Sequence, residues 1–285
     1  MTPSTQVAII IPMFAGEELA PPLAASIAQQ THPPSECIVV RGVSPNGRAR
    51  NRGVAQSRAE WLLFVDDDAV LGHADLIERL LRAAQHPTVG IVGSARILPT
   101  SASPFEQAVA AQVARIINPI VPSDCVTNPD APHFYCNITT TCCLMHRSVF
   151  DQVGGFDETL TRGVDSEFFV RVRQRTARNI VQAGHTWVYH PAPTTRRALW
   201  HKHVAYGRGH AQEVRRDPRR ARGGNYFHTP LHAVLWLGMR TILAPLHALI
   251  PYSYGDPRWR VGWYPLKALA SYASAVGYVI GWYRQ

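Results

Sequence analysis

Short apolar runs alternate with segments of helical spacing through the first third of this chain, and the alternation restricts the folds open to it. The strand-like runs are 7–11, 37–40, 61–65 and 89–92, and the helix-like segments between them are 19–30, 53–59 and 75–85. This rhythm is typical of a parallel sheet wound with helices. Because 46% of the 285 residues are hydrophobic, the chain can also bury a sizeable core. We therefore expect one large α/β domain with a C-terminal addition.

The middle of the chain is less regular. A stretch rich in Pro, Ser and Ala, residues 98–132, has amphipathic character but predicts no particular element, and it is a candidate for the loop that recognises the acceptor. Residues 137–145 then predict a strand, and residues 147–153 and 166–176 predict helices on either side of a Gly-Gly turn.

Three consecutive aspartates, Asp66, Asp67 and Asp68, follow the run 61–65 where a buried strand would end. Parallel α/β sheets bind ligands beyond the carboxyl ends of their strands. Three carboxylates emerging together repel one another unless a cation or hydrogen-bond donors are near. Carboxylate oxygens suit Mg²⁺ or Mn²⁺, hard ions that bridge a protein to a diphosphate. An isolated acidic triplet is more often a solvated turn, but the buried strand before it favours a metal site.

Five motifs stand in a fixed order over residues 5–210. They are VAIIIP (7–12), ARNRG (49–53), LFVDDD (63–68), GGFDE (154–158) and GVDSE (163–167). Each is weak alone, but together they make the chain resemble family 2 glycosyltransferases. The resemblance implies a GT-A fold, that is, a mostly parallel sheet flanked by helices, with an activated sugar donor and inversion at the anomeric carbon. It implies a catalytic domain over 1–195, with a donor-binding half to about 98 and an acceptor half from about 99.

On the donor side, the resemblance implies that Asp66 contacts the donor nucleoside or its ribose and that Asp68 coordinates the metal. The further donor-binding candidates are Pro12, Arg50, Asn51 and Asp67. His190 resembles the histidine that completes the metal and diphosphate site in many GT-A enzymes. The alternative interpretation of His190 is an ordinary core or surface histidine.

Asp165 resembles the general base of the family. A carboxylate is needed there because the acceptor hydroxyl must lose its proton as it attacks the anomeric carbon. Glu167 is the second candidate, and on a helix it would point about 200° away from Asp165, so we expect one of the two to face the cleft. Asp165 could instead cap the helix that follows it.

The resemblance places the GGFDE turn on the acceptor side, where Gly155, Phe156 and Asp157 are candidates. Two glycines permit a close backbone approach, and Phe156 can anchor the turn. An equally good interpretation of Asp157 is that it only stabilises the turn. The chain departs from the family pattern at Arg41, where many members carry an acidic residue that contacts the nucleobase, and at Val164, which replaces an acid before the base.

The C-terminal part, 196–285, is basic and apolar. Residues 196–222 contain nine Arg or Lys against two acids, and the apolar segments 229–250 and 264–283 follow. A basic stretch attracts anionic lipid, nucleic acid or phosphorylated substrates, or is simply a solvated helix face. Arg240 and Pro245 argue for an interfacial helix in the first segment rather than a span. We expect these helices to contact a membrane surface or to pack against the catalytic domain.

The expected partners are a nucleotide-diphosphate sugar and a glycan or lipid-linked acceptor, with nucleic acid unlikely. Five cysteines without a CxxC pair favour a reducing compartment, and the N-terminal sequence does not resemble a signal peptide. We therefore expect a cytoplasmic protein at the inner face of the plasma membrane. Two other functions stay open from the sequence: a metal-dependent nucleotidyltransferase, and a non-catalytic nucleotide- or nucleic-acid-binding protein that uses the basic stretch.

Overall fold

The chain forms two compact units. The computed structural model describes residues 5–16, 18–128, 138–216, 218, 226–249 and 262–283. Unit 1 comprises residues 1–99, 117–159 and 164–191, and unit 2 comprises residues 100–116, 160–163 and 192–285. Unit 2 therefore takes in three segments that were expected in the catalytic domain, namely 100–116, 160–163 and 192–195.

Unit 1 is built on one mixed β-sheet. In chain order its strands are β1 (Val7–Met13), β2 (Glu36–Arg41), β3 (Trp61–Val65), β4 (Val70–Leu71), β5 (Val89–Ile97), β6 (Cys125–Val126), β7 (Cys142–His146) and β8 (Asn179–Tyr189). In space the order is β2-β1-β3-β7-β5-β8-β4, and β6 pairs with β8. Strands β1, β2, β3, β5 and β8 share one direction, whereas β7, β4 and β6 run antiparallel to their neighbours.

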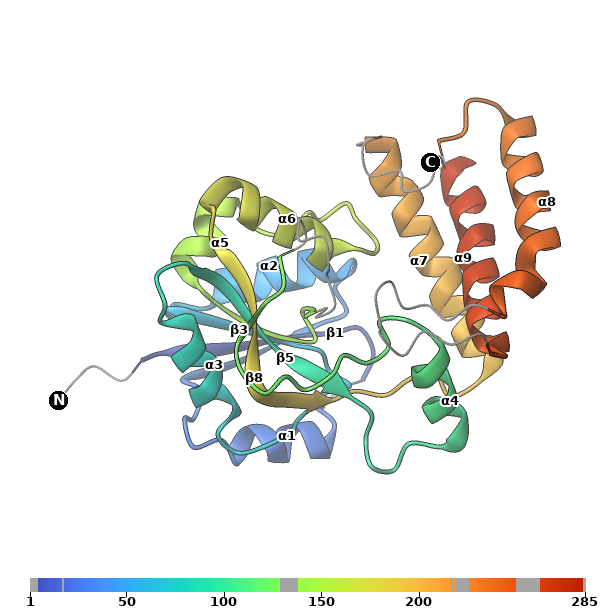
Figure 1. Ribbon diagram of the computed structural model, residues 1–285. Coiled ribbons are helices and arrows are strands. Elements are labelled where there is room, and N and C mark those ends of the chain that lie inside the picture. Colours follow the sequence, from blue (N-terminus) through green and yellow to red (C-terminus); the bar gives the residue numbers. More distant parts are fainter. Residues whose placement is uncertain are drawn as a thin grey trace. The chain divides into compact units, whose positions relative to one another are not determined.

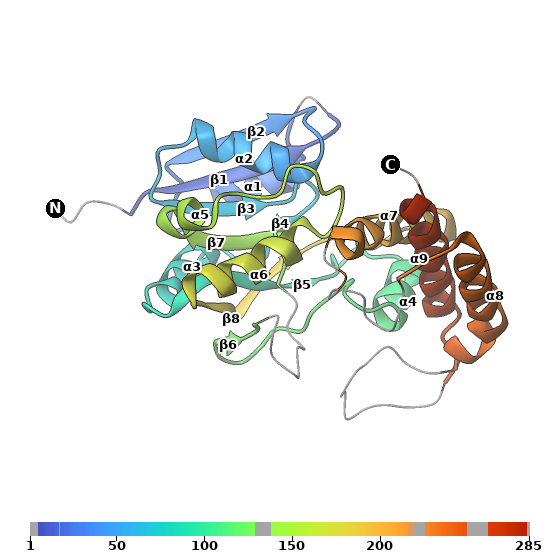
Figure 2. The same ribbon diagram turned by 90° about the horizontal axis from the view of Figure 1, so that it is seen from above.

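Helices cover both faces of this sheet (Figures 1 and 2). Helices α1 (Pro21–Ala28) and α3 (Leu76–Ala84) lie on one face, and α2 (Asn46–Gln56), α5 (Arg147–Val153) and α6 (Val164–Thr176) lie on the other. This layering buries the sheet on both sides, which explains why β1 and β3 are almost continuous apolar runs rather than alternating ones.

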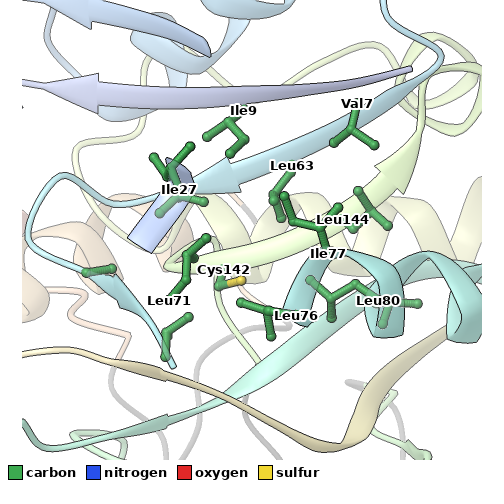
Figure 3. Close-up of a cluster of buried hydrophobic side chains, with 14 of the residues drawn as sticks. Val7, Ile9, Ile27, Leu63, Leu71, Leu76, Ile77, Leu80, Cys142 and Leu144 are labelled. Atoms are coloured by element: carbon green, nitrogen blue, oxygen red, sulfur yellow. The ribbon is translucent and has the colours of Figure 1, made fainter. Parts of the chain in front are cut away.

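The core on the first face is aliphatic (Figure 3). Side chains of β1 and β3, such as Ile9 and Leu63, meet Ile27 of α1 and Leu76 and Leu80 of α3, and all five are buried. The core on the second face is aromatic instead. Its rings belong to Phe64, Phe150, Phe156 and Phe168, with centroids between 4.4 and 6.3 Å apart. The aromatic cluster holds the GGFDE turn against β3.

The observed elements confirm some predicted boundaries and move others. The strand at 61–65 and the helix at 147–153 lie where the sequence predicts them. The strand predicted at 137–145 is observed at 142–146, and its first predicted residue lies outside the described residues. The segment 98–132, which was left unassigned, contains α4 (Pro104–Gln112) and β6, and its last four residues lie outside the described part of the chain.

Helix α2 differs most from its prediction. It begins at Asn46 and ends at Gln56, whereas the sequence predicted a helix over 53–59. Its first two turns are rich in arginine and lack an apolar stripe, so periodicity could not find them. A Cβ on Gly53 would lie 2.4 Å from the Ile10 side chain, so the glycine is what lets α2 lie directly on β1.

Unit 2 contains α4 and three longer helices, α7 (Arg196–Arg216), α8 (Pro230–His247) and α9 (Pro265–Tyr283). Asp217 and residues 219–222 of the basic stretch lie outside the described residues. Helices α7 and α9 touch through their backbones: a Cβ on Gly207 would lie 2.0 Å from the Ser274 carbonyl oxygen, and one on Gly277 would lie 2.1 Å from that of Val204. Among the described helices, none has the length and apolar character that crossing a membrane requires.

Candidate active site

The acidic run lies at the carboxyl end of β3, as the sequence predicts for a ligand site. The peptide N–H of Asp66 donates to the carbonyl of Thr141, and the Asp66 carbonyl accepts from Ala69 N–H at 3.1 Å, which closes a turn. The Asp66 and Asp67 side chains are partly buried, and Asp68 is exposed. The turn therefore points one carboxylate into the protein and one towards solvent.

Asp66 is held on both carboxylate oxygens. Arg50 donates from Nη2 to Oδ1 at 2.8 Å, and Thr141 donates from Oγ1 to Oδ2 at 2.9 Å. Burial acts to raise the pKa of Asp66, but the charges of Arg50 and His190 and the Thr141 hydrogen bond outweigh it, and the pKa lies below its usual value. Asp66 is thus a fixed, ionised carboxylate at neutral pH.

A chain of hydrogen bonds extends from Asp66 into the protein. Thr141 accepts from Thr139 Oγ1 at 2.9 Å, and Thr139 accepts from Nη1 of the buried Arg96 at 2.8 Å. The backbone N–H of Arg96 donates to Asn118, which places this segment of β5 firmly. Arg96 is therefore linked to Asp66 by hydrogen bonds through the hydroxyls of Thr139 and Thr141.

Three side chains present a donor set suited to a divalent cation. Ligand atoms of Asp66, Asp68 and His190 all lie within 4.8 Å of one another, and His190 Nε2 is 3.3 Å from Asp68 Oδ1. Two carboxylates and an imidazole match the ligand preferences of Mn²⁺. The residues present therefore fit the predicted ion.

The neighbours of this set support the same interpretation. His190 directly follows β8, and its backbone N–H donates to the Ile97 carbonyl at 2.9 Å, so the end of β5 fixes its position. Burial, and after it the charges of Asp68 and Asp66, raise the pKa of Asp67. Mutual repulsion within the acidic turn thus adds to the effect of burial at Asp67, and a cation relieves repulsion of this kind.

Asp165, the predicted base, lies in the first turn of α6. Its Oδ1 accepts the backbone N–H of Ser166 at 2.9 Å. Burial is the main cause that raises the pKa of the Cys143 thiol well above its usual value. The neighbouring Cys142 adds to the rise, Arg50 opposes it, and the negative charges of Asp165 and Asp66 make smaller contributions that raise it. Cys143 lies beside Phe64 in the β3–β7 register. Asp165 and Asp66 thus both act electrostatically on Cys143 of β7.

Glu167, the second candidate base, is engaged elsewhere. Arg171 donates to both of its oxygens, from Nε at 2.5 Å and from Nη2 at 2.8 Å. The same guanidinium donates to the carbonyls of Val153 and Gly155. Glu167 consequently orients an arginine that holds the Gly-Gly turn, and Asp165 is the better placed of the two to act as a base.

The GGFDE turn needs both of its glycines. Gly154 ends α5 at φ 90° and Gly155 follows at φ 71°, a conformation that disfavours side chains. Asn51 holds the turn from α2: its amide donates to the Phe156 carbonyl at 2.9 Å, and its Oδ1 accepts the Phe156 N–H at 2.9 Å. Its amide also donates to Glu158 at 3.0 Å. The Asn51 amide, predicted to hold nucleotide, is thus occupied with the turn.

The remaining candidates lie as follows. Phe156 is buried, and the Arg50 guanidinium lies 5.8 Å from its ring centroid, so the turn also supports the partner of Asp66. Asp157 accepts from the backbone and hydroxyl of Thr159, which makes it part of the turn's own structure. Pro12 is buried within β1, where it pairs with Val40 of β2.

The sequence did not predict the residues whose hydrogen bonds hold the Asp66 carboxylate. Thr139, Thr141 and Arg96 carried no motif, although a run of threonines, Thr139–Thr141, directly before a buried strand is unusual enough to suggest a polar site. Glu158 was also missed as a contact: it pairs with Arg48 of α2 at 3.1 Å, and chiefly its hydrogen bond from Asn51 lowers its pKa.

Comparison with known protein families decides where the chain belongs. The model of the family described as "Glycosyltransferase like family 2" matches residues 22–216, which is more than half of the chain. The chain belongs to this glycosyltransferase-like family 2. The matched range begins in α1 and ends with α7, and it includes every candidate site residue named above except Pro12.

Two curated relatives share part of the chain. It is 26% identical over 170 residues to the O-antigen biosynthesis protein RfbC of Myxococcus xanthus, covering 55% of this family 2 chain and 13% of the relative. It is also 26% identical over 181 residues to the uncharacterized protein y4gI of Sinorhizobium fredii, covering 62% and 19%. The family 2 chain thus spans less than a fifth of the length of either relative.

Solved structures show the same fold. The mannosyltransferase PcManGT of Pyrobaculum calidifontis, solved in complex with GDP-Man and Mn²⁺, gives a TM-score of 0.55 at 13% identity, covering 95% of this chain and 85% of that one. Residues 1–349 of S. aureus TarS give 0.51 at 14%, covering 97% and 90%. The GT-A-type α/β fold predicted for this family 2 chain is confirmed, with a mixed central sheet.

Proposed function

We propose that the chain transfers a sugar from a nucleotide-diphosphate donor to an acceptor hydroxyl, with inversion at the anomeric carbon. The observation that carries the proposal is the grouping of Asp66, Asp68 and His190, whose ligand atoms lie within 4.8 Å of one another at the carboxyl end of β3. Family membership and the sugar-nucleotide complex of the similar mannosyltransferase agree with it.

On the donor side, the chain's own residues supply binding and orientation. Asp66, locked by Arg50 and Thr141, offers an immobile carboxylate edge to the hydroxyls of the donor nucleoside. Asp68 and His190 are the side chains that would hold Mg²⁺ or Mn²⁺ together with Asp66. When bound, such an ion neutralises the diphosphate charge that grows as the nucleotide leaves.

On the acceptor side, Asp165 removes the proton. One of its oxygens is occupied by the Ser166 N–H, and we propose that the other accepts the hydroxyl proton. The acceptor oxygen forms the new bond to the anomeric carbon while the bond to the donor diphosphate oxygen breaks, so the configuration inverts. A carboxylate in this role contributes about 10²- to 10⁴-fold to the rate.

We further propose that the acceptor is a glycan or a lipid-linked sugar and that the protein works at the inner face of the plasma membrane. The support is the basic C-terminal part, in which residues 196–222 contain nine Arg or Lys against two acids, because clusters of cations are attracted to anionic lipids.

The donor half of the proposal is tested by thermal-shift titration with UDP, GDP and their sugar conjugates, with and without Mn²⁺. We expect a nucleotide to raise the melting temperature only when Mn²⁺ is present, and Asp68→Ala to remove that dependence. A nucleotide-dependent rise in melting temperature that is the same with and without Mn²⁺, and the same in Asp68→Ala, would contradict the metal site.

The base is tested with Asp165→Asn, using the exposed Asp151→Asn on α5 as the matched control. We expect Asp165→Asn to keep the nucleotide-dependent shift and to lose at least about 100-fold in nucleoside diphosphate release with an acceptor panel. Asp151→Asn should match the unaltered chain. Full turnover by Asp165→Asn would remove it from the base role.

A further inference from the structure

Helix α8 carries an apolar stripe on its exposed side. Six large apolar residues of this helix are between 50% and 79% exposed, namely Leu231, Val234, Leu235, Met239, Ile242 and Leu246. At about 100° per residue they fall within an arc of roughly 140°, so they form one continuous face, here called the α8 stripe. An exposed apolar surface of this extent is unusual on a soluble protein and indicates a partner.

The opposite side of α8 anchors the helix to unit 2. Ala233 and Trp236 are buried in a cluster with residues of α7 and α9. Arg240 lies half a turn of the helical wheel from the stripe, with its guanidinium 5.1 Å from the Trp236 ring centroid. Arg240 is the helix's one arginine, and the helix contains no lysine and no acidic residue. The α8 stripe is therefore free of formal charge.

Exposed aromatic side chains lie at both ends of α8. The N–H groups of Gly262 and Tyr264 donate to the carbonyls of Leu249 and Ala248, which places Trp263, 68% exposed, at the carboxyl end. At the other end, the hydroxyl of Tyr283 donates to the Thr229 carbonyl at 3.1 Å. Amphipathic rings at the two ends of an apolar face are typical of elements that lie in a lipid interface.

The positive charge of the chain is concentrated in the C-terminal part of the sequence that contains this helix. Residues 192–285 contain 14 Lys and Arg against three acids, whereas residues 1–191 contain 15 against 17. The whole positive excess of the protein thus lies in the C-terminal part. A second copy docked on the α8 stripe would bring two such strongly positive regions together, which is unfavourable, whereas an anionic surface would neutralise them.

We propose that the α8 stripe docks onto an anionic membrane surface, with the helix lying in the plane of the interface. Its apolar face enters the boundary between headgroups and acyl chains, Trp263 and Tyr283 lie at headgroup level, and basic residues of the C-terminal part pair with lipid phosphates. This inference gives the proposed membrane location a physical surface. It does not depend on the transfer reaction, so the two can fail separately.

The test is flotation of the full chain with vesicles. We expect the protein to float with vesicles of phosphatidylcholine and phosphatidylglycerol, to do so much less with phosphatidylcholine alone, and to be released by salt. The double variant Leu235→Gln/Ile242→Gln should reduce the partition coefficient at least about tenfold. Val126→Gln is the matched control, since Val126 is 53% exposed but belongs to β6 of unit 1.

A spectroscopic readout accompanies the flotation. Emission from Trp263 should shift to the blue with anionic vesicles, and Trp263→Phe should remove most of that shift. Asp68→Ala should float like the unaltered chain, which separates this surface from the candidate active site. Undiminished flotation of the double variant, absence of flotation with anionic vesicles, or a dimer in sedimentation that the double variant abolishes would each overturn the proposal.

Discussion

The Arg50–Asp66 ion pair is the contact in the candidate site whose removal should cost the most stability. The Arg50 side chain is 4% exposed and that of Asp66 is 24% exposed, with 2.8 Å between Nη2 and Oδ1. Arg50→Met keeps most of the aliphatic stem but leaves a largely enclosed carboxylate without its cation. Breaking a buried pair costs about 3–5 kcal/mol, and because solvent reaches part of Asp66 we expect the lower end, about 3 kcal/mol.

The assay is thermal unfolding at neutral pH, where a loss of this size should lower the melting temperature of unit 1 by roughly 6–12 °C. Arg48→Met is the matched control on the same helix, because Arg48 is 48% exposed and its pair with Glu158 is open to solvent. Such a pair contributes less than about 1 kcal/mol. Adding Asp66→Asn to Arg50→Met should recover part of the lost melting temperature, because the neutral amide leaves no unpaired charge in the enclosed site.

The pH dependence gives a second check. In the intact pair the pKa of Asp66 lies below the ordinary value of 3.8. The ion pair therefore contributes fully to the stability of the folded state above pH 3.8, and this contribution is lost as the pH falls through the lowered pKa. Without Arg50, burial raises the pKa of Asp66, so Arg50→Met takes up a proton at a higher pH than the unaltered protein. The difference in melting temperature between the two proteins should therefore become smaller in acid. Equal melting temperatures for Arg50→Met and Arg48→Met would refute the reasoning.

Three further outcomes are expected. Thr141→Val should cost about 1–2 kcal/mol in urea unfolding, because one oxygen of Asp66 loses its donor, and Thr141→Ser should restore it. Gly155→Ala should lower stability by about 1–2 kcal/mol, since φ is 71° and a Cβ would lie 3.1 Å from a side-chain oxygen, whereas Gly238→Ala, with open space around it, should not. Burial lowers the pKa of His203 to about 4 from 6.5, so stability should fall as the pH drops from 6.5 towards 4. His203→Gln should flatten that acid slope in melting curves, and an unchanged slope would exclude His203 as its source.

The sequence predicted the elements whose signal is local. The strand at 61–65 is apolar on both faces, and the helix at 147–153 ends at a glycine pair, so both could be placed without knowing their neighbours. Strand direction could not be predicted in this way. Strand β7 is antiparallel between β3 and β5, and nothing in its five residues records this, because direction depends on the path of the chain before it.

Contacts within the candidate site could not be predicted where they depend on the direction of a side chain or on a partner far along the chain. Adjacent helical residues point about 100° apart, so Arg50 reaches Asp66 while Asn51 reaches the GGFDE turn. The motif alone predicted the same nucleotide-binding role for Arg50 and Asn51. Thr141 lies 75 positions from Asp66 along the chain, and only the β3–β7 pairing brings the two together.

The backbone contact between α7 and α9 bears on how this protein can be divided. The family match ends at residue 216, with the last residue of α7, and a fragment designed from that boundary would omit α9. It would thereby uncover the Gly207 surface, where no side chain is available to cover the exposed peptide groups. A cut at the family boundary thus divides a structural unit, and useful fragments of this chain must retain the helix at its far end.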